Sequence, residues 1–145
     1  MLHDWLVLII PLAAYLITQG AKLAFDGVKG NLDIYNMWTK YGGMPSAHSA
    51  FVISLTVFLG LQEGFTSPIF AIAVVFSTIT IRDAIGVRRE IGYHGEALNA
   101  LVYKLPESEQ TTFQNFTEKM GHSPLEIFVG SIFGLIIALL GFYFL

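Results

Sequence analysis

Four stretches of the sequence contain no Asp, Glu, Lys or Arg: Trp5 to Ala21, Tyr41 to Gln62, Gly64 to Ile81, and Ile127 to Leu145. A helix needs about 20 apolar residues to cross the interior of a membrane, and each stretch approaches or reaches that length. Charged residues make up only 13% of the chain, against about 25% in soluble domains. The alternative, a soluble bundle of buried helices, would require amphipathic partner helices that are missing here.

We therefore predict an all-α fold, an integral membrane helical bundle with about four transmembrane helices and one interfacial helix. Residues 1–145 would form a single membrane-embedded domain, the usual size for one domain. The second stretch must be partly loop, because the run from Gly42 to Pro45 does not suit the middle of a helix. The start of the chain lacks the basic segment of a signal peptide, so the first stretch is expected to be a retained helix.

Three serines mark expected helix starts. Ser67 is followed by Pro68, which suits an N-cap with proline at the first helical position. Ser123 is followed three residues later by Glu126, the pattern of a capping box. Ser46 follows Pro45 and is expected to open the helix of the second stretch.

The basic residues predict the orientation in the membrane. With four spans, all eight Lys and Arg residues fall on one side, and the positive-inside rule places that side in the cytoplasm with both termini outside. A bacterial inner membrane is the expected location. The basic residues are Lys22, Lys29, Lys40, Arg82, Arg88, Arg89, Lys104 and Lys119.

The segment from Asp83 to Tyr103 is charged but keeps apolar residues at regular positions, which favours an interfacial or partly inserted helix. The following segment, from Pro106 to Gly121, is polar and is expected to be a surface excursion.

The first candidate site is the run GGMPSAHSA, residues 42–50. Gly43 permits close approach of the backbone to a ligand, and the helix behind Pro45 directs free N–H groups and a positive dipole end toward the same place. Ser46 adds a hydroxyl donor, and His48 adds a group that titrates near neutrality. This pattern favours a phosphate-binding site with an acid or base beside it, although an ordinary helix start is the simpler alternative.

The second candidate is the run RDAIGVRR, residues 82–89. Arg88 and Asn99 would share one helix face with Gly92 and Gly95 between them, which permits close packing or close ligand approach. Asp83 and His94 would share another face. Arginine suits phosphate oxygens, but Arg88 and Arg89 could equally serve as positive-inside anchors.

Two more groups complete the set. His122 precedes the expected helix start at Ser123, and Lys22 ends the first span, where it would either extend to the interface or offer charge to a phosphate. The four histidines lack metal-ligand spacing, so we expect chemistry without a metal or other cofactor. The net charge of −3 gives no basic surface for nucleic acid.

These motifs together resemble a known family. GGMPSAHSA, RDAIGVRR with the later Leu98-Asn99, and GHSPLEIFVG are similar to the divergent branch of the type-2 phosphatidic acid phosphatase superfamily, which also contains the vanadium-dependent haloperoxidases. The resemblance implies an all-helical fold and metal-independent phosphate ester hydrolysis through a phosphohistidine. It also implies that His48 is the general acid and that Ser46 and Gly43 contact the phosphate.

Two family motifs are incomplete. The K-x6-R-P motif is matched only by Lys22 and Lys29, and the R-x5-H-x3-D motif is matched by Arg88 and His94 but has Leu98 in place of the aspartate. His94 and His122 are therefore rival candidates for the nucleophile. The catalytic candidates are His48, His122, His94, Arg88 and Asp83, and the substrate-binding candidates are Lys22, Gly43, Ser46, Arg89 and Asn99.

Three functions compete. The leading hypothesis is a phosphatase or phosphotransferase that acts on a lipid or isoprenoid phosphate at the cytoplasmic face. The second is a non-catalytic membrane protein of the same scaffold that binds an anionic lipid or a protein partner, and a homodimer is an open alternative for either function. The third is a small transporter or channel subunit whose path would be lined by Gln19, Ser54, Thr56, Ser77, Thr78 and Thr80.

Overall fold

A computed structural model describes residues 2–25, 43–118 and 120–145 of the chain. Over these residues the structure is helical and contains no β-strand, which confirms the predicted all-α fold. The helices are α1 (Leu2–Phe25), α3 (Ala47–Glu63), α4 (Pro68–Ile85), α5 (Val87–Val102), α6 (Glu107–Gln110) and α7 (Pro124–Phe144).

Three segments are long and apolar enough to cross a membrane: Trp5–Lys22 in α1, Pro68–Val102 over α4 and α5, and Pro124–Phe144 in α7. The fourth apolar helix, α3, is shorter. All three predicted serine caps are confirmed. The Ser46 and Ser67 hydroxyls accept from the N–H groups of Ser49 and Phe70, and Ser123 forms a capping box with Glu126.

Helix α3 is the centre of the bundle. It packs against α7, α1 and α4, and α1 also packs against α7. Small side chains and glycines fill these contacts. Gly130 and Gly134 of α7 lie so close to Ser46 and Ala50 of α3 that a Cβ on either glycine would collide with the α3 backbone. Close approach of backbones at small residues is the usual way in which helices associate in membranes.

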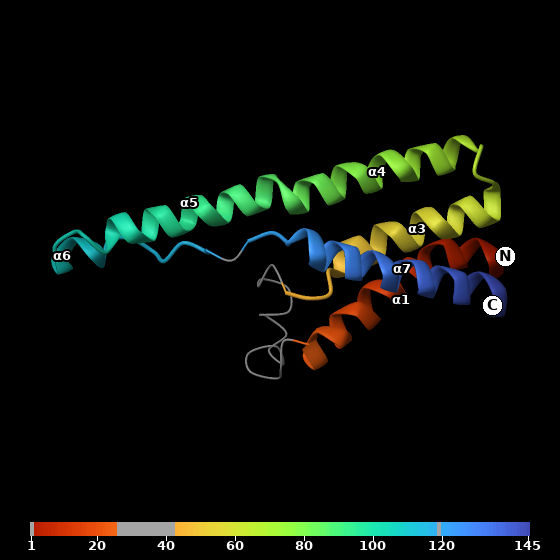
Figure 1. Cartoon of the computed structure of the whole chain (residues 1–145), viewed down its shortest axis with the longest axis horizontal. Coiled ribbons are helices and arrows are strands. Elements are labelled where there is room, and N and C mark those ends of the chain that lie inside the picture. Colours follow the sequence, from red (N-terminus) through yellow and green to blue (C-terminus); the bar gives the residue numbers. More distant parts are fainter. Residues whose placement is uncertain (1, 26–42, 119) are drawn as a thin grey trace.

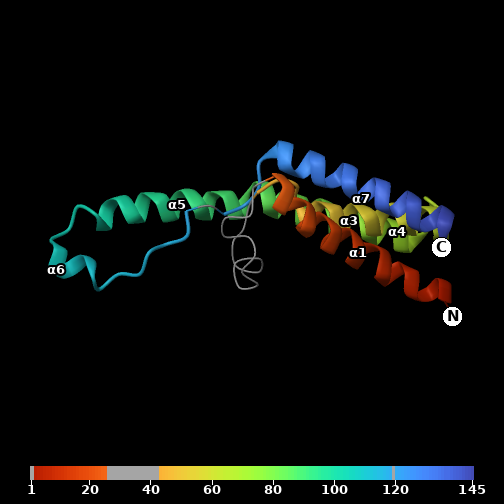
Figure 2. The ribbon, with the colours of Figure 1, turned by 90° about the horizontal axis from the view of Figure 1, so that it is seen from below.

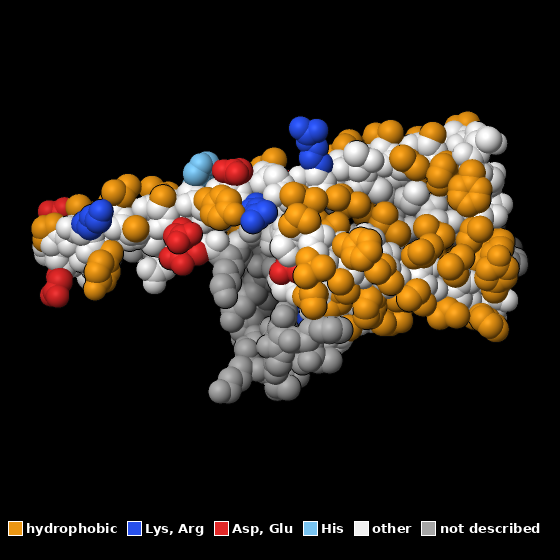
Figure 3. All heavy atoms as spheres, in the orientation of Figure 1, with side chains coloured by type: hydrophobic (Ala, Val, Ile, Leu, Met, Phe, Trp, Pro, Cys, Tyr) orange, Lys and Arg blue, Asp and Glu red, His pale blue; other side chains and the backbone are white. Residues whose placement is uncertain are grey.

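Many large apolar side chains point outward, although Phe58 and Ile10 are buried in the core. Among the exposed residues on α4 are Ile72, Val75 and Ile79, while the buried positions of that helix are Ala73, Ser77 and Ala84. Figure 3 shows hydrophobic side chains covering the visible surface of the bundle. Because this surface suits hydrocarbon rather than water, it agrees with the predicted membrane location.

Both termini and the turn between α3 and α4 lie at one end of the bundle, while the end of α1 and the junction of α4 with α5 lie at the other (Figure 1). Lys22, Arg82 and Arg88 therefore gather at the end opposite the termini. Lys29, Lys40 and Lys119 lie outside the described residues.

Helix α5 continues beyond the bundle roughly along the direction of α4 (Figures 1 and 2). Gly86 separates the two helices, yet its N–H still donates to the Arg82 carbonyl and its carbonyl accepts from Glu90 N–H. We call residues 87–112, which contain α5 and α6, the arm. The segment expected to be a surface excursion thus consists of the short helix α6 and an extended return toward α7.

The return segment, residues 113–118 with Met120 and Gly121, is called the strap. It runs back along α5 toward α7 (Figure 2). The Asn99 amide donates to the Phe116 carbonyl and accepts from Phe116 N–H, both at 2.9 Å. Gly92 and Gly95 lie against the strap backbone with no room for a Cβ. The predicted glycine face of α5 therefore serves close packing of the chain on itself.

Candidate active site

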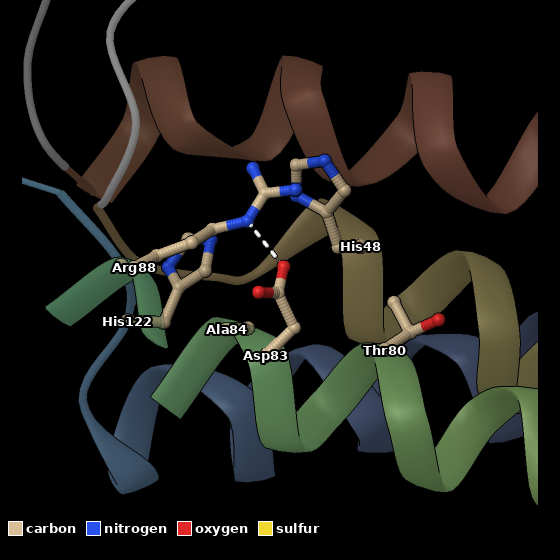
Figure 4. Close-up of a pocket in the computed structure, with 7 residues that line it drawn as sticks. His48, Thr80, Asp83, Ala84, Arg88 and His122 are labelled. Atoms are coloured by element: carbon tan, nitrogen blue, oxygen red, sulfur yellow. Dashed lines mark hydrogen bonds and ion pairs between the residues drawn. The ribbon is translucent and has the colours of Figure 1, made fainter. Parts of the chain in front are cut away.

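A pocket lies where α3 begins, α4 ends, α5 begins and the strap meets α7. It is lined by His48, Thr80, Asp83, Ala84, Arg88, Gly121 and His122 (Figure 4). The space within it is about 20 Å³, enough for one water molecule. The pocket unites residues from three of the sequence motifs.

Contacts between the first turns of α3 and α7 bring the two histidines together. Ser46 N–H donates to the Glu126 carbonyl at 3.0 Å, and the Ser49 hydroxyl donates to the Ile127 carbonyl at 3.2 Å. His48 lies in the first turn of α3, and the backbone N–H of His122 donates to the Ala84 carbonyl of α4. As a result, the ring centroids of His48 and His122 are 6.1 Å apart.

Arg88 and Asp83 form an ion pair at the pocket. The Arg88 Nε atom lies 2.6 Å from Asp83 Oδ2, and Figure 4 shows the Arg88 guanidinium reaching past His122 toward His48. The two residues face each other because Gly86 joins the last turn of α4 to the first turn of α5. The Asp83 carboxylate is the acidic group that lines the pocket among the described residues.

His122 is buried, with 5% of its side chain exposed, and its Nδ1 atom lies 3.0 Å from Glu126 Oε2. The same carboxylate oxygen accepts from Ser123 N–H at 3.0 Å. Since a carboxylate only accepts hydrogen bonds, Nδ1 carries the proton and Nε2, across the ring, keeps the lone pair. Glu126 thus fixes both the tautomer and the orientation of the ring.

Glu126 is the functional residue that the sequence interpretation missed, because it was assigned only to the capping box. A signal was present: His122 and Glu126 have the His-x3-carboxylate spacing of the family's third motif, with glutamate for aspartate. Arg88, His94 and Leu98 are the other match to that motif, and of these three residues Arg88 lines the pocket. Glu126 reaches the site through its contact with His122, whose side chain lines the pocket.

Burial lowers the pKa of His122 below its ordinary value of 6.5, because removal from water disfavours the charged form. The hydrogen bond and charge of Glu126 oppose this shift, while the charges of Lys22 and Arg88 reinforce it. His122 is therefore a neutral imidazole at pH 7, which is the form that can act as a nucleophile.

The electrostatic setting favours an anion. The first turns of α3 and α7 lie beside the pocket, and the start of a helix carries a positive dipole end. Lys22, in the last turn of α1, is close enough for its charge to act on His122 although it does not line the pocket. This arrangement suits a phosphate group held by backbone N–H groups and cations.

Other predicted site residues lie elsewhere. His94 and Arg89 are exposed on α5, outside the pocket lining, and the Arg89 guanidinium lies 5.7 Å from the centre of the Tyr93 ring. Asn99 holds the strap, and its amide also donates to Glu118 Oε1 at 2.8 Å. The structure therefore does not bring His94, Arg89 and Asn99 into the pocket lining with His48 and His122.

Gly43 and Ser46 support the pocket without lining it. Gly43 has a φ of 90°, a conformation that favours glycine, just before α3. The Ser46 hydroxyl is fully buried and accepts from Ser49 N–H at 3.4 Å. Both residues shape the start of α3, and thereby the position of His48.

The polar residues considered for a transport path are mostly satisfied by the helices themselves. The Thr56 and Ser77 hydroxyls contact each other at 2.6 Å and both donate toward the Val52 carbonyl. Thr78 and Thr80 donate to carbonyls one turn earlier in α4. The Thr56 and Ser77 hydroxyls thus join α3 to α4, whereas those of Thr78 and Thr80 bond within α4.

Metal ligands do not gather in the described part of the chain. Over residues 2–25, 43–118 and 120–145, no three His, Asp or Glu side chains are grouped as a metal site would require.

Comparison with known proteins agrees with the motifs. Residues 4–137 match the model of the Divergent PAP2 family. The chain is 33% identical over 148 aligned residues to the uncharacterized membrane protein YuiD of Bacillus subtilis, and the alignment covers 94% of each chain. No solved structure matches the chain. From its motifs, its helical bundle and these matches, we conclude that the chain is an integral membrane protein that belongs to the Divergent PAP2 family.

Proposed function

We propose that this protein is a membrane phosphatase or phosphotransferase that cleaves a lipid or isoprenoid phosphate ester through a phosphohistidine. The observation that carries the proposal is the pairing of His48 and His122, 6.1 Å apart in one pocket with Arg88. A protein that only binds lipid would not need His48 beside a His122 ring that Glu126 orients.

The chemistry follows from the two rings. The lone pair on His122 Nε2 attacks phosphorus, the bond between phosphorus and the ester oxygen breaks, and His48, in its protonated imidazolium form, donates a proton to the departing oxygen. Water then attacks the phosphohistidine while His48 takes a proton from it, which releases phosphate and restores both rings. A hydroxyl acceptor in place of water would give phosphotransfer.

Arg88 and the helix N-termini would stabilise the charge on the phosphoryl oxygens, which is the main term in such reactions. Since the space in the pocket holds about one water molecule, a phosphate needs more room than the pocket offers in this arrangement. Separation of Arg88 from Asp83 would supply both the room and a guanidinium for the phosphate. In this proposal the Asp83 carboxylate pairs with Arg88 until the phosphate of the substrate replaces it.

The substrate is expected to be a lipid because the pocket lies at one end of a bundle whose outer surface is apolar. An apolar tail would stay in the bilayer while its phosphate enters between α3, α4 and the strap. The basic residues at this end favour the cytoplasmic side for the pocket, with both termini outside.

The test is phosphate release from a panel of lipid phosphates in the presence of EDTA, with wild type and the His48→Ala, His122→Ala and Arg88→Ala variants. We expect release by wild type and loss in all three variants, while the matched control His94→Ala keeps its activity. With radiolabelled substrate, a base-stable phosphoprotein should form in wild type and be absent in His122→Ala. No release from any substrate by folded wild type would favour the anionic-lipid-binding alternative.

Orientation is tested separately. The chain has no cysteine, so single cysteines at Leu145 and at Ser108 report the two ends of the molecule. In intact cells, we expect a membrane-impermeant maleimide to label Leu145→Cys and to label Ser108→Cys only after lysis. The reverse pattern would place the pocket on the outer face.

A further inference from the structure

Helix α5 exposes a narrow apolar stripe on the arm. Val87, Ile91, Leu98 and Leu101 are 43–60% exposed, and the exposed His94 lies between them. These five positions are separated by steps of four and three residues in alternation. That spacing is the heptad pattern of a helix that packs lengthwise against another helix.

Nothing in the described part of the chain covers this stripe. The strap occupies the neighbouring face of α5, which carries Gly92, Gly95 and Asn99. The arm also extends past the bundle (Figures 1 and 2), so the bundle helices do not reach the stripe. Figure 3 shows hydrophobic side chains along the arm.

We propose that the stripe binds the same stripe of a second copy of this chain, in parallel and in register, around a two-fold axis along the membrane normal. Two copies anchored in one bilayer direct α4 and α5 the same way, so their arms are parallel. Each stripe residue then meets its own counterpart, because the two-fold axis runs along the stripe. His94 then lies against His94 of the second copy. A shift of one helix along the other would bury His94 against leucine, so this polar layer favours the in-register pairing.

Charge argues against a membrane surface or nucleic acid as the occupant. Residues 87–118 contain three basic residues and five acidic residues, a net charge of −2. Helices that lie on anionic lipid carry Lys and Arg on their polar face, and an acidic segment is repelled by lipid phosphates and by nucleic acid alike. The stripe itself carries no Asp, Glu, Lys or Arg, so two copies can meet without repulsion.

The bilayer compensates for the shortness of the stripe. A helix of 16 residues is about 24 Å long, and so short a pair associates weakly in free solution. Anchoring in one membrane raises the effective concentration of the second arm. We therefore expect dimers in bilayers that dissociate when the protein is diluted in detergent.

The absence of native cysteine permits a direct test in proteoliposomes. Leu98→Cys places a thiol in the stripe, and Glu96→Cys places one on the opposite face of the same turn, at another exposed position. On oxidation, we expect a disulfide-linked dimer from Leu98→Cys and only monomer from Glu96→Cys. Equal cross-linking of both variants, or none from either, would overturn the proposal.

A second measurement does not depend on cross-linking. Resonance energy transfer between labelled copies in vesicles should be lost in Leu98→Glu and retained in Glu96→Ala. Antiparallel pairing is distinguished by mixing single cysteines: it would link Leu98→Cys to Ile91→Cys in preference to itself, which would overturn the parallel arrangement. A third outcome is also informative. If Leu98→Cys stays monomeric and its labelling by maleimide is blocked when protein-free lipid vesicles are added, the stripe binds lipid and the proposal is overturned.

Discussion

The Nδ1 atom of His122 lies 3.0 Å from Oε2 of Glu126, one helical turn later in the chain. This contact gives the pocket an oriented, neutral histidine just before the start of α7. It also shows that one glutamate performs two tasks, since the same oxygen caps α7 through Ser123 N–H.

Replacement of Glu126 by glutamine should lower kcat for phosphate release by roughly 10- to 100-fold, as expected when a group that orients a functional histidine loses its charge. The amide can still accept from Ser123 N–H, so the helix start is preserved. Initial rates with a lipid phosphate measure the effect. Glu63→Gln, an exposed change at the other end of α3, is the control and should match wild type. Unchanged kcat in Glu126→Gln would exclude the orienting role.

Acid should destabilise the protein through His122. Because burial lowers the pKa of His122 below 6.5 in the folded state, the unfolded chain binds a proton that the folded chain does not between those two pKa values. The stabilising contribution is therefore complete above pH 6.5 and is lost as the pH falls toward the folded pKa. Thermal unfolding from pH 7.5 to pH 5 should show a smaller drop in Tm for His122→Gln than for wild type. Parallel curves for the two proteins would contradict this.

Asn99 should act on the pocket through the strap. Asn99→Ala removes two hydrogen bonds to Phe116 and one to Glu118, each with a net value of about 1 kcal/mol. The strap should then exchange its amide hydrogens faster over residues 116–118 and 120–121. Misplacement of His122 by about 1 Å should lower kcat up to about 100-fold. Glu96→Ala, on an exposed face of the same helix, should change neither measurement. If Asn99→Ala lowered kcat while amide exchange in the strap stayed slow, Asn99 would instead contact the substrate directly.

The contact between α3 and α7 should not tolerate a methyl group. In Gly134→Ala the new Cβ would collide with the backbone of Ala50, and overpacking of this kind costs about 1–3 kcal/mol. Gly20→Ala on α1 is the matched control, because its Cβ would meet nothing within 4 Å and alanine favours a helix by up to about 1 kcal/mol over glycine. Thermal unfolding should therefore show a lower Tm for Gly134→Ala alone. Equal Tm values for the two variants would mean that α7 can shift away from α3.

The sequence by itself was enough to predict the helices and their location in a membrane. Uncharged stretches of membrane-spanning length predicted the all-α bundle, and the serine caps at Ser46, Ser67 and Ser123 predicted where three helices begin. These features depend on neighbours within one turn, so they can be derived from local spacing. The motif at His48 was recognised for the same reason, because its glycines, proline and histidine are contiguous.

Only the tertiary structure decided which residues share the pocket. His94 and His122 were equal candidates from the sequence, and the choice between them depended on the strap folding back along α5, a long-range contact held by Asn99 and the glycines at positions 92 and 95. That contact brings His122 to Ala84 and hence to His48, and leaves His94 exposed on the arm. Local patterns specify helices, whereas the position of one helix end beside another depends on packing between residues far apart in the chain.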